Sequence, residues 1–195
     1  QMYPDTDSPP CLVPRDRVKQ IGARLPESPW IRRERLLDAR VSECLAEQLI
    51  TSPYYHLFWH ILGESQLPAN RIARVFVQDL ATARRSGGHP EQIADDAWRR
   101  LFHHLQAGEL HWGAVPSLVH LRSRMPEAEW LALASQSGLL PQPEREWQSI
   151  ADSLLKTAPR SKNADARLRW IMGQLQTPPG RVPPQAALEY IRQHL

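Results

Sequence analysis

The chain has 195 residues, of which 42% are hydrophobic, and its 24 basic and 21 acidic side chains leave a net charge of +3. A chain of this size and composition can bury a sizeable core. No apolar run approaches the ~18 residues that a membrane span needs, and no signal peptide is visible. Its two cysteines form neither a disulfide framework nor a zinc site alone. We therefore expect a cytoplasmic protein with no membrane association.

The first part of the chain is predicted to be an irregular segment followed by short helices. Residues 1–14 contain four prolines and no helical period. The apolar spacing that follows predicts helices near residues 18–25, 31–40, 42–50 and 55–62.

Prolines mark the starts of the later helices. The chain has 18 of them, roughly twice the usual ~5% share. Apolar residues at helical spacing follow six of these prolines: Pro68, Pro90, Pro126, Pro143, Pro159 and Pro184. Proline suits the first turn of a helix because its missing N–H has no intrahelical partner there. Strand patterns are absent apart from a doubtful stretch at residues 115–121, so the sequence predicts an all-α fold.

Residues that could support catalysis do not converge in the sequence. His56 and His60 stand four apart and could share one helical face, but no glutamate occupies the position that a helical zinc-protease motif needs. The apolar residues around them favour structural histidines at a packing surface. We also find no nucleophile elbow, phosphate loop or dinucleotide fingerprint. We therefore expect no catalytic site, no metal site and no cofactor in this chain. The sequence is more typical of a binding module than of an enzyme.

Basic residues are concentrated at the C-terminal end. The last forty residues hold seven bases and two acids, whereas the preceding 155 residues have two more acids than bases. A basic end favours an anionic partner such as a phosphate backbone. The alternative is a solvated, arginine-rich helix surface. Trp170 lies in this region and either stacks on a partner or packs against a neighbouring helix, whereas Trp98, Trp130 and Trp147 fall on apolar stripes and are predicted to be core residues.

Two segments resemble a known family. The opening Met2-Tyr3-Pro4-Asp5-Thr6-Asp7 resembles the junction after the catalytic domain in the GatB and GatE subunits of Glu-tRNA(Gln) amidotransferases, and is closer to GatE. Near the other end, Ile171-Met172-Gly173-Gln174-Leu175, followed by Gly180-Arg181-Val182-Pro183-Pro184, resembles the terminal signature of the YqeY-type domain. The chain departs from that signature at Gln176, where the family usually has lysine.

The resemblance implies a tRNA-binding tail that lacks the catalytic domain. Residues 1–125 would form a helical domain with a junction at 1–14, and residues 126–195 a smaller YqeY-like domain. The tail would hold tRNA, in this family tRNA(Gln), and could contact other components of the amidotransferase. The alternatives are a helical protein-interaction module and the YqeY-type appendage of a glutaminyl-tRNA synthetase.

The bases and the resemblance together indicate candidate tRNA-binding residues near the C-terminus. Basic side chains that could contact phosphates are Lys156, Arg160, Lys162, Arg167, Arg169 and Arg181. The signature adds Gly173, where helices could pack closely, Gln174, and Gly180, which provides a turn. Arg181 would lie beside the start of the last helix, whose backbone N–H groups can bind phosphate.

Overall fold

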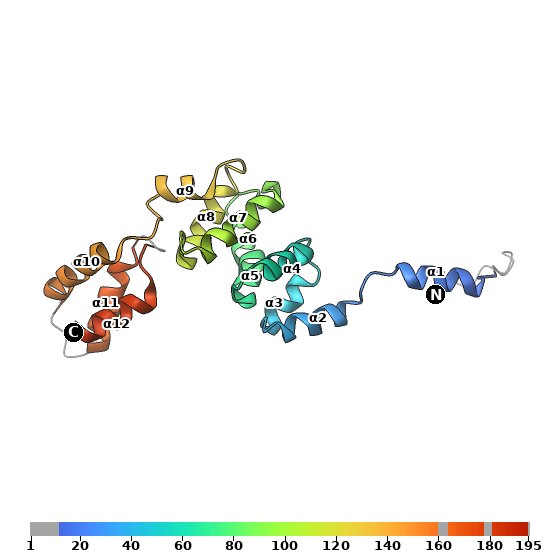
Figure 1. Ribbon diagram of the computed structural model, residues 1–195, viewed down its shortest axis with the longest axis horizontal. Coiled ribbons are helices and arrows are strands. Elements are labelled where there is room, and N and C mark those ends of the chain that lie inside the picture. The colour runs from blue at the N-terminus through green and yellow to red at the C-terminus, as the bar shows by residue number, and fades with distance from the viewer. Residues whose placement is uncertain (1–11, 160–163, 178–180, 195) are drawn as a thin grey trace, which may run out of the picture.

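The computed structural model describes residues 12–159, 164–177 and 181–194, and within these ranges the chain contains α-helices and short 3₁₀ and π segments but no strand (Figure 1). The prediction of an all-α fold is confirmed. The earlier helices are α1 (Arg15–Arg24), α2 (Pro29–Asp38), α3 (Glu43–Leu49), α4 (Tyr55–Glu64), α5 (Ala69–Arg74) and α6 (Leu80–Arg85). The later ones are α7 (Asp95–Gln106), α8 (Val115–Arg122), α9 (Trp130–Gln136), α10 (Glu144–Thr157), α11 (Ala164–Leu175) and α12 (Pro184–His194).

Prolines lie at or shortly before several helix starts. Pro68 and Pro143 are the N-caps of α5 and α10, and Pro184 is the first residue of α12. Pro90 instead opens a 3₁₀ turn, η2 (Pro90–Gln92), before α7. The doubtful strand at residues 115–121 is helix α8, which begins with a valine and a proline.

One large core joins the helices from α2 to α9. It centres on aromatic side chains, with the Tyr54 ring stacked on Phe76 at 5.2 Å and Phe76 in edge contact with Trp98 at 5.5 Å. Trp98 and Trp130 are both fully buried, as predicted, and their ring centroids lie 5.6 Å apart. Burial of such large side chains supplies most of the stabilisation of this part of the fold.

A π-helical segment interrupts the longest run of helix in this core. The segment η1 (Val75–Asp79) follows α5 without a break and leads directly into α6. A π-helical turn adds a residue to the ordinary turn, and such turns are frequent at functional sites. Here the turn keeps Val75, Phe76 and Val77 buried, while Asp79 is only half-buried.

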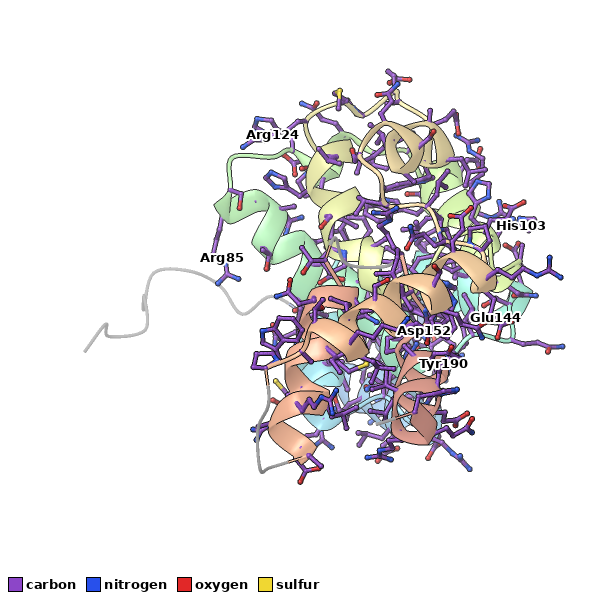
Figure 2. The ribbon with its side chains drawn as sticks, turned by 90° about the vertical axis from the view of Figure 1, so that its left-hand side faces the viewer. Arg85, His103, Arg124, Glu144, Asp152 and Tyr190 are labelled. Carbon is purple, nitrogen blue, oxygen red and sulfur yellow. The ribbon has the colours of Figure 1, made fainter. Side chains whose placement is uncertain are left out.

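A second, smaller core is formed by α10, α11 and α12, which pack against one another (Figure 1). It contains Trp147, as predicted, together with Ile171 and Ile191. Tyr190 on α12 contacts the edge of the Trp147 ring at 5.5 Å and donates a hydrogen bond to Asp152 Oδ1 on α10 at 2.9 Å. Figure 2 shows Tyr190 and Asp152 side by side on the face of these helices.

The boundary between the two cores does not coincide with the predicted boundary at residue 125. Helix α9 packs in the first core, which extends to Leu139, and the second core begins at Trp147. The division of the chain into residues 1–125 and 126–195 as separate domains remains a prediction.

Helix α1 lies apart from both cores and buries none of its residues (Figure 1). Its apolar side chains Val18 and Ile21 are more than half exposed, as is Leu25 just after it.

Candidate nucleic-acid interface

Four exposed residues of α11 lie next to one another on its solvent side. Arg169, Trp170, Gly173 and Gln174 are exposed, and their spacing of three and four residues places them on one side of the helix. The opposite side buries Ile171 and Leu175 in the second core. Trp170 is 37% exposed. These four residues, which we call the α11 face, combine a cation, an aromatic ring and an amide, the groups that contact phosphates and unstacked bases.

Arg169 and Lys156 are the two exposed cations among the described candidate residues. Arg169 Nε donates to the carbonyl of Asp165 at 3.2 Å, one turn earlier in α11. Its terminal nitrogens donate to none of the residues that the structure describes. Lys156 lies in the last turn of α10. Long, exposed cationic side chains of this kind can reach phosphate oxygens.

The surface of the α11 face is unobstructed at Gly173. A Cβ added there would meet no atom within 4 Å apart from its own helix and chain neighbours. The close packing against another helix that we expected at this glycine is therefore not observed among the described residues. The open surface instead permits a ligand to approach the helix backbone.

Arg167 and Arg181 are half-buried, and each takes part in a hydrogen bond beside the second core, Arg167 through its side chain and Arg181 through its backbone. Arg167 donates from Nη2 to the Leu155 carbonyl at the end of α10, a group that lacks an intrahelical partner. The Arg181 carbonyl accepts a hydrogen bond from the Gln142 backbone N–H at 2.7 Å. The Arg167 side chain thus joins α11 to α10, whereas a phosphate contact of the Arg181 side chain remains a prediction. The candidates Arg160, Lys162 and Gly180 lie outside the described residues.

A pocket of about 590 Å³ lies between the first core and the start of α12. One wall is formed by Arg71 and Arg74 of α5 and Asp79 of η1, and another by His111 and Trp112, the latter being the first residue of the 3₁₀ turn η3 (Trp112–Ala114). Residues 182–185 line the third side. No sequence motif indicated this pocket. The sequence feature that could have indicated the pocket is the spacing of Arg71 and Arg74, because residues three apart share one side of a helix.

Two titratable groups of this pocket are shifted by burial. Burial raises the pKa of the Asp79 carboxyl, an effect that the positive charge of Arg74 partly offsets. Burial also lowers the pKa of His111. In both groups partial removal of water disfavours the charged form, which is the carboxylate for Asp79 and the imidazolium for His111.

The histidine pair that we considered as a metal site is exposed. His56 and His60 both lie on the solvent side of α4, so the expectation that they pack against a neighbouring helix is wrong. Within the described ranges, no group of three or more His, Cys, Asp or Glu side chains is placed to hold a metal ion. None of the described helices is both long and apolar enough to cross a bilayer.

Comparison with known proteins finds similarity to the GatE subunits of glutamyl-tRNA(Gln) amidotransferases. GatE of Methanopyrus kandleri is 26% identical over 130 residues, which are 66% of this chain and 20% of the relative. GatE of Thermococcus gammatolerans is 27% identical over 157 residues, or 80% of this chain and 25% of the relative. GatE of Saccharolobus solfataricus is 23% identical over 200 residues, or 100% of this chain and 31% of the relative.

The chain is similar to GatE subunits. The resemblance predicted from its two end segments is confirmed for GatE, whereas the YqeY-like character of the second core remains a prediction. No family model matches the chain. The chain spans about a fifth to a third of the length of these GatE relatives.

Proposed function

We propose that this chain is the tRNA-binding part of a GatE-like component of a glutamyl-tRNA(Gln) amidotransferase. The observation behind the proposal is the α11 face, which presents Arg169 and Trp170 to solvent in a chain related to GatE. The basic surplus of the last forty residues supports an anionic ligand at this end. The substrate would be tRNA(Gln), held for an upstream catalytic domain, and other amidotransferase subunits are the expected protein partners. Such a component would act in the cytoplasm, where aminoacyl-tRNA is made and used.

The α11 face suits tRNA because it offers both kinds of contact that nucleic acids need. Arg169, with Lys156 on the neighbouring helix, would neutralise phosphates and position the RNA without reading its sequence. Trp170 would stack on an exposed base, and Gln174 would hydrogen-bond to a base edge or a ribose hydroxyl. The open surface at Gly173 would let the RNA backbone approach the helix.

A salt-dependent titration tests the proposal. We expect the full chain to bind tRNA(Gln), with log affinity falling linearly as log salt rises. Arg169→Ala removes one phosphate contact, so binding should weaken about three- to tenfold and the salt slope should fall by about one. Trp170→Ala should weaken binding by a similar factor without changing the slope, because stacking releases no counterion.

The matched control is Arg85→Ala. Arg85 is an exposed arginine at the end of α6 whose side chain donates only to Thr82 Oγ1 among the described residues. Its substitution removes the same charge from α6, where Figure 2 labels Arg85. If Arg85→Ala weakens binding as much as Arg169→Ala, only net charge matters and the α11 face is not the interface. Absence of tRNA binding at low salt would contradict the proposal as a whole and favour a protein-interaction module.

A further inference from the structure

The pocket beside α5 has the size and composition of a ligand site, although the tRNA proposal makes no use of it. Its volume of about 590 Å³ lies within the ~300–1,000 Å³ of typical small-molecule sites. It is lined by segments that are far apart in the sequence: α5 and η1, the turn at residues 111–113, and the start of α12. A site of this kind is formed by the tertiary structure, so sequence motifs do not reveal it.

Two cations occupy one wall of the pocket. Arg71 and Arg74 are both exposed and lie three residues apart on α5, so they share a side of the helix. Neither forms a salt bridge with any residue that the structure describes. Paired guanidinium groups that form no salt bridge are suited to bind a phosphate group through charge-assisted hydrogen bonds.

A flat stacking surface lies beside these cations. The Arg71 guanidinium is positioned over the Trp112 ring, with its carbon 5.4 Å from the ring centroid. Trp112 is only half-buried. Nucleobases stack on aromatic rings and on guanidinium planes alike, so this stacked pair offers a platform for a base.

The third element is a carboxylate without a hydrogen-bond partner. Asp79 lies in the π-helical segment, is half-buried, and accepts no hydrogen bond from the described part of the chain. The favourable charge that acts on it is that of Arg74. Holding a carboxylate in a partly desolvated place opposes folding. A ligand N–H group would satisfy it, as acidic side chains accept hydrogen bonds from the amino groups of bases.

These three features together exclude simpler ligands. An ionised acidic side chain would satisfy the arginines, but it offers no flat ring for the stacking platform and no N–H donor for Asp79. A metal ion is not the expected occupant either, because no group of three or more His, Cys, Asp or Glu side chains is placed to hold one in the described ranges. A ligand that is anionic at one end, flat in the middle and an N–H donor at the other end matches all three.

We propose that this pocket binds a nucleotide, with its phosphate on Arg74 and the edge of the Arg71 guanidinium, its base stacked on the outer face of that guanidinium, which covers Trp112, and an amino group of the base donating to Asp79. The nucleotide is either a free nucleoside monophosphate or a single unstacked nucleotide of a bound RNA. In the second form the inference rests on the proposed function, because the RNA would be the tRNA.

The test measures binding of AMP, adenosine and a short single-stranded oligoadenylate to the full chain by equilibrium dialysis. We expect AMP or the oligoadenylate to bind and adenosine to bind at least tenfold more weakly, because it lacks the phosphate. Tight binding of AMP alone identifies a free-nucleotide site, whereas weak AMP binding with tight oligoadenylate binding identifies an RNA-nucleotide site.

Matched double variants locate the binding. Arg71→Gln with Arg74→Gln should weaken binding of the preferred ligand by about tenfold or more, since both charge-assisted hydrogen bonds to the phosphate are lost. Arg84→Gln with Arg85→Gln removes the same charge from exposed residues of the next helix, outside the pocket lining, and should leave binding unchanged. Asp79→Leu, which removes the acceptor, should also weaken binding.

The outcomes separate this inference from the tRNA proposal. If the wild-type chain binds tRNA but neither AMP nor oligoadenylate, or if the Arg71 and Arg74 variant binds them normally, the pocket inference is overturned and the proposed function stands. If the chain binds AMP through these arginines but binds no tRNA, the pocket inference stands as a free-nucleotide site and the proposed function fails.

Discussion

Asp79 is a charged side chain placed where the fold makes charge unfavourable. It is half-buried in η1, and burial is the main reason why its pKa is raised. A group whose pKa is higher in the folded state adds stability at low pH, and this contribution is lost as the pH rises through the folded-state pKa. At neutral pH the ionised carboxylate therefore lowers the free energy of unfolding.

We expect Asp79→Asn to raise the urea midpoint of unfolding at pH 7, because the amide carries no charge to desolvate. The gain should shrink as the pH falls through the raised folded-state pKa and should be gone below about 4, the ordinary pKa of aspartate, because Asp79 is then neutral in both the folded and the unfolded chain. Urea titrations of both chains at several pH values measure the difference. A variant less stable than the wild type at neutral pH would show that Asp79 has a stabilising partner.

Arginine candidates of the same residue type differ because their surroundings differ. Arg169 is exposed on α11, whereas Arg167, two residues earlier, is half-buried and donates to the Leu155 carbonyl. The sequence shows the surplus of basic residues near the C-terminus, but a count of charges cannot distinguish Arg167 from Arg169. Only the packing of α11 against α10 separates a side chain that joins two helices from one that faces solvent.

The contact between α6 and α8 depends on a glycine. Gly88 follows α6, and a Cβ added to it would lie 2.0 Å from Oγ and 2.8 Å from Cβ of Ser123, which is buried at the end of α8. The backbones are joined here by a hydrogen bond from the His89 N–H to the Ser123 carbonyl at 2.8 Å. A glycine after a helix is a common stop signal in a sequence, but the sequence does not show that this one allows two helices to approach.

We expect Gly88→Ala to destabilise the protein by about 1–3 kcal/mol, the usual range for overpacking a well-packed site. Gly63→Ala is the matched control, because a Cβ at that position in α4 would meet nothing within 4 Å, and alanine favours a helix by about 1 kcal/mol over glycine. Thermal or urea unfolding measures both changes. Adding Ser123→Gly to Gly88→Ala should recover part of the loss, and equal behaviour of the two alanine variants would contradict this account of Gly88.

Some helices begin at the proline that predicted their start, and others begin several residues later. Pro68, Pro143 and Pro184 stand at the starts of α5, α10 and α12, as their fixed φ and missing N–H favour. After Pro126 the helix begins only at Trp130, because proline restricts its neighbours without requiring a helix to follow at once. The π-helical segment had no local signal.

The separation into two cores predicts two units of stability. The second core is much smaller than the first, and its buried residues come from α10, α11, α12 and the turns beside them. Small cores bury less apolar surface per residue and are less stable. Because neither cluster includes a residue of the other, we expect α10–α12 to open without unfolding α2–α9.

Ile171→Ala tests this expectation. Ile171 is fully buried in the second core, and its truncation should cost about 2–5 kcal/mol there. Amide hydrogen exchange should show faster exchange in α10–α12 and unchanged protection in α7. An equal loss of protection in α7 would mean that the two cores unfold together.

The all-α class, the helix order and the relation to GatE follow from local information: apolar periodicity, prolines before helices and short motifs at both ends. Such patterns depend on neighbours along the chain, so they can be read before folding. The assignment of α9 to the first core, the exposure of Trp170 and the pocket beside Arg71 depend on contacts between segments tens of residues apart. No local pattern encodes those contacts, because they arise only when the helices pack.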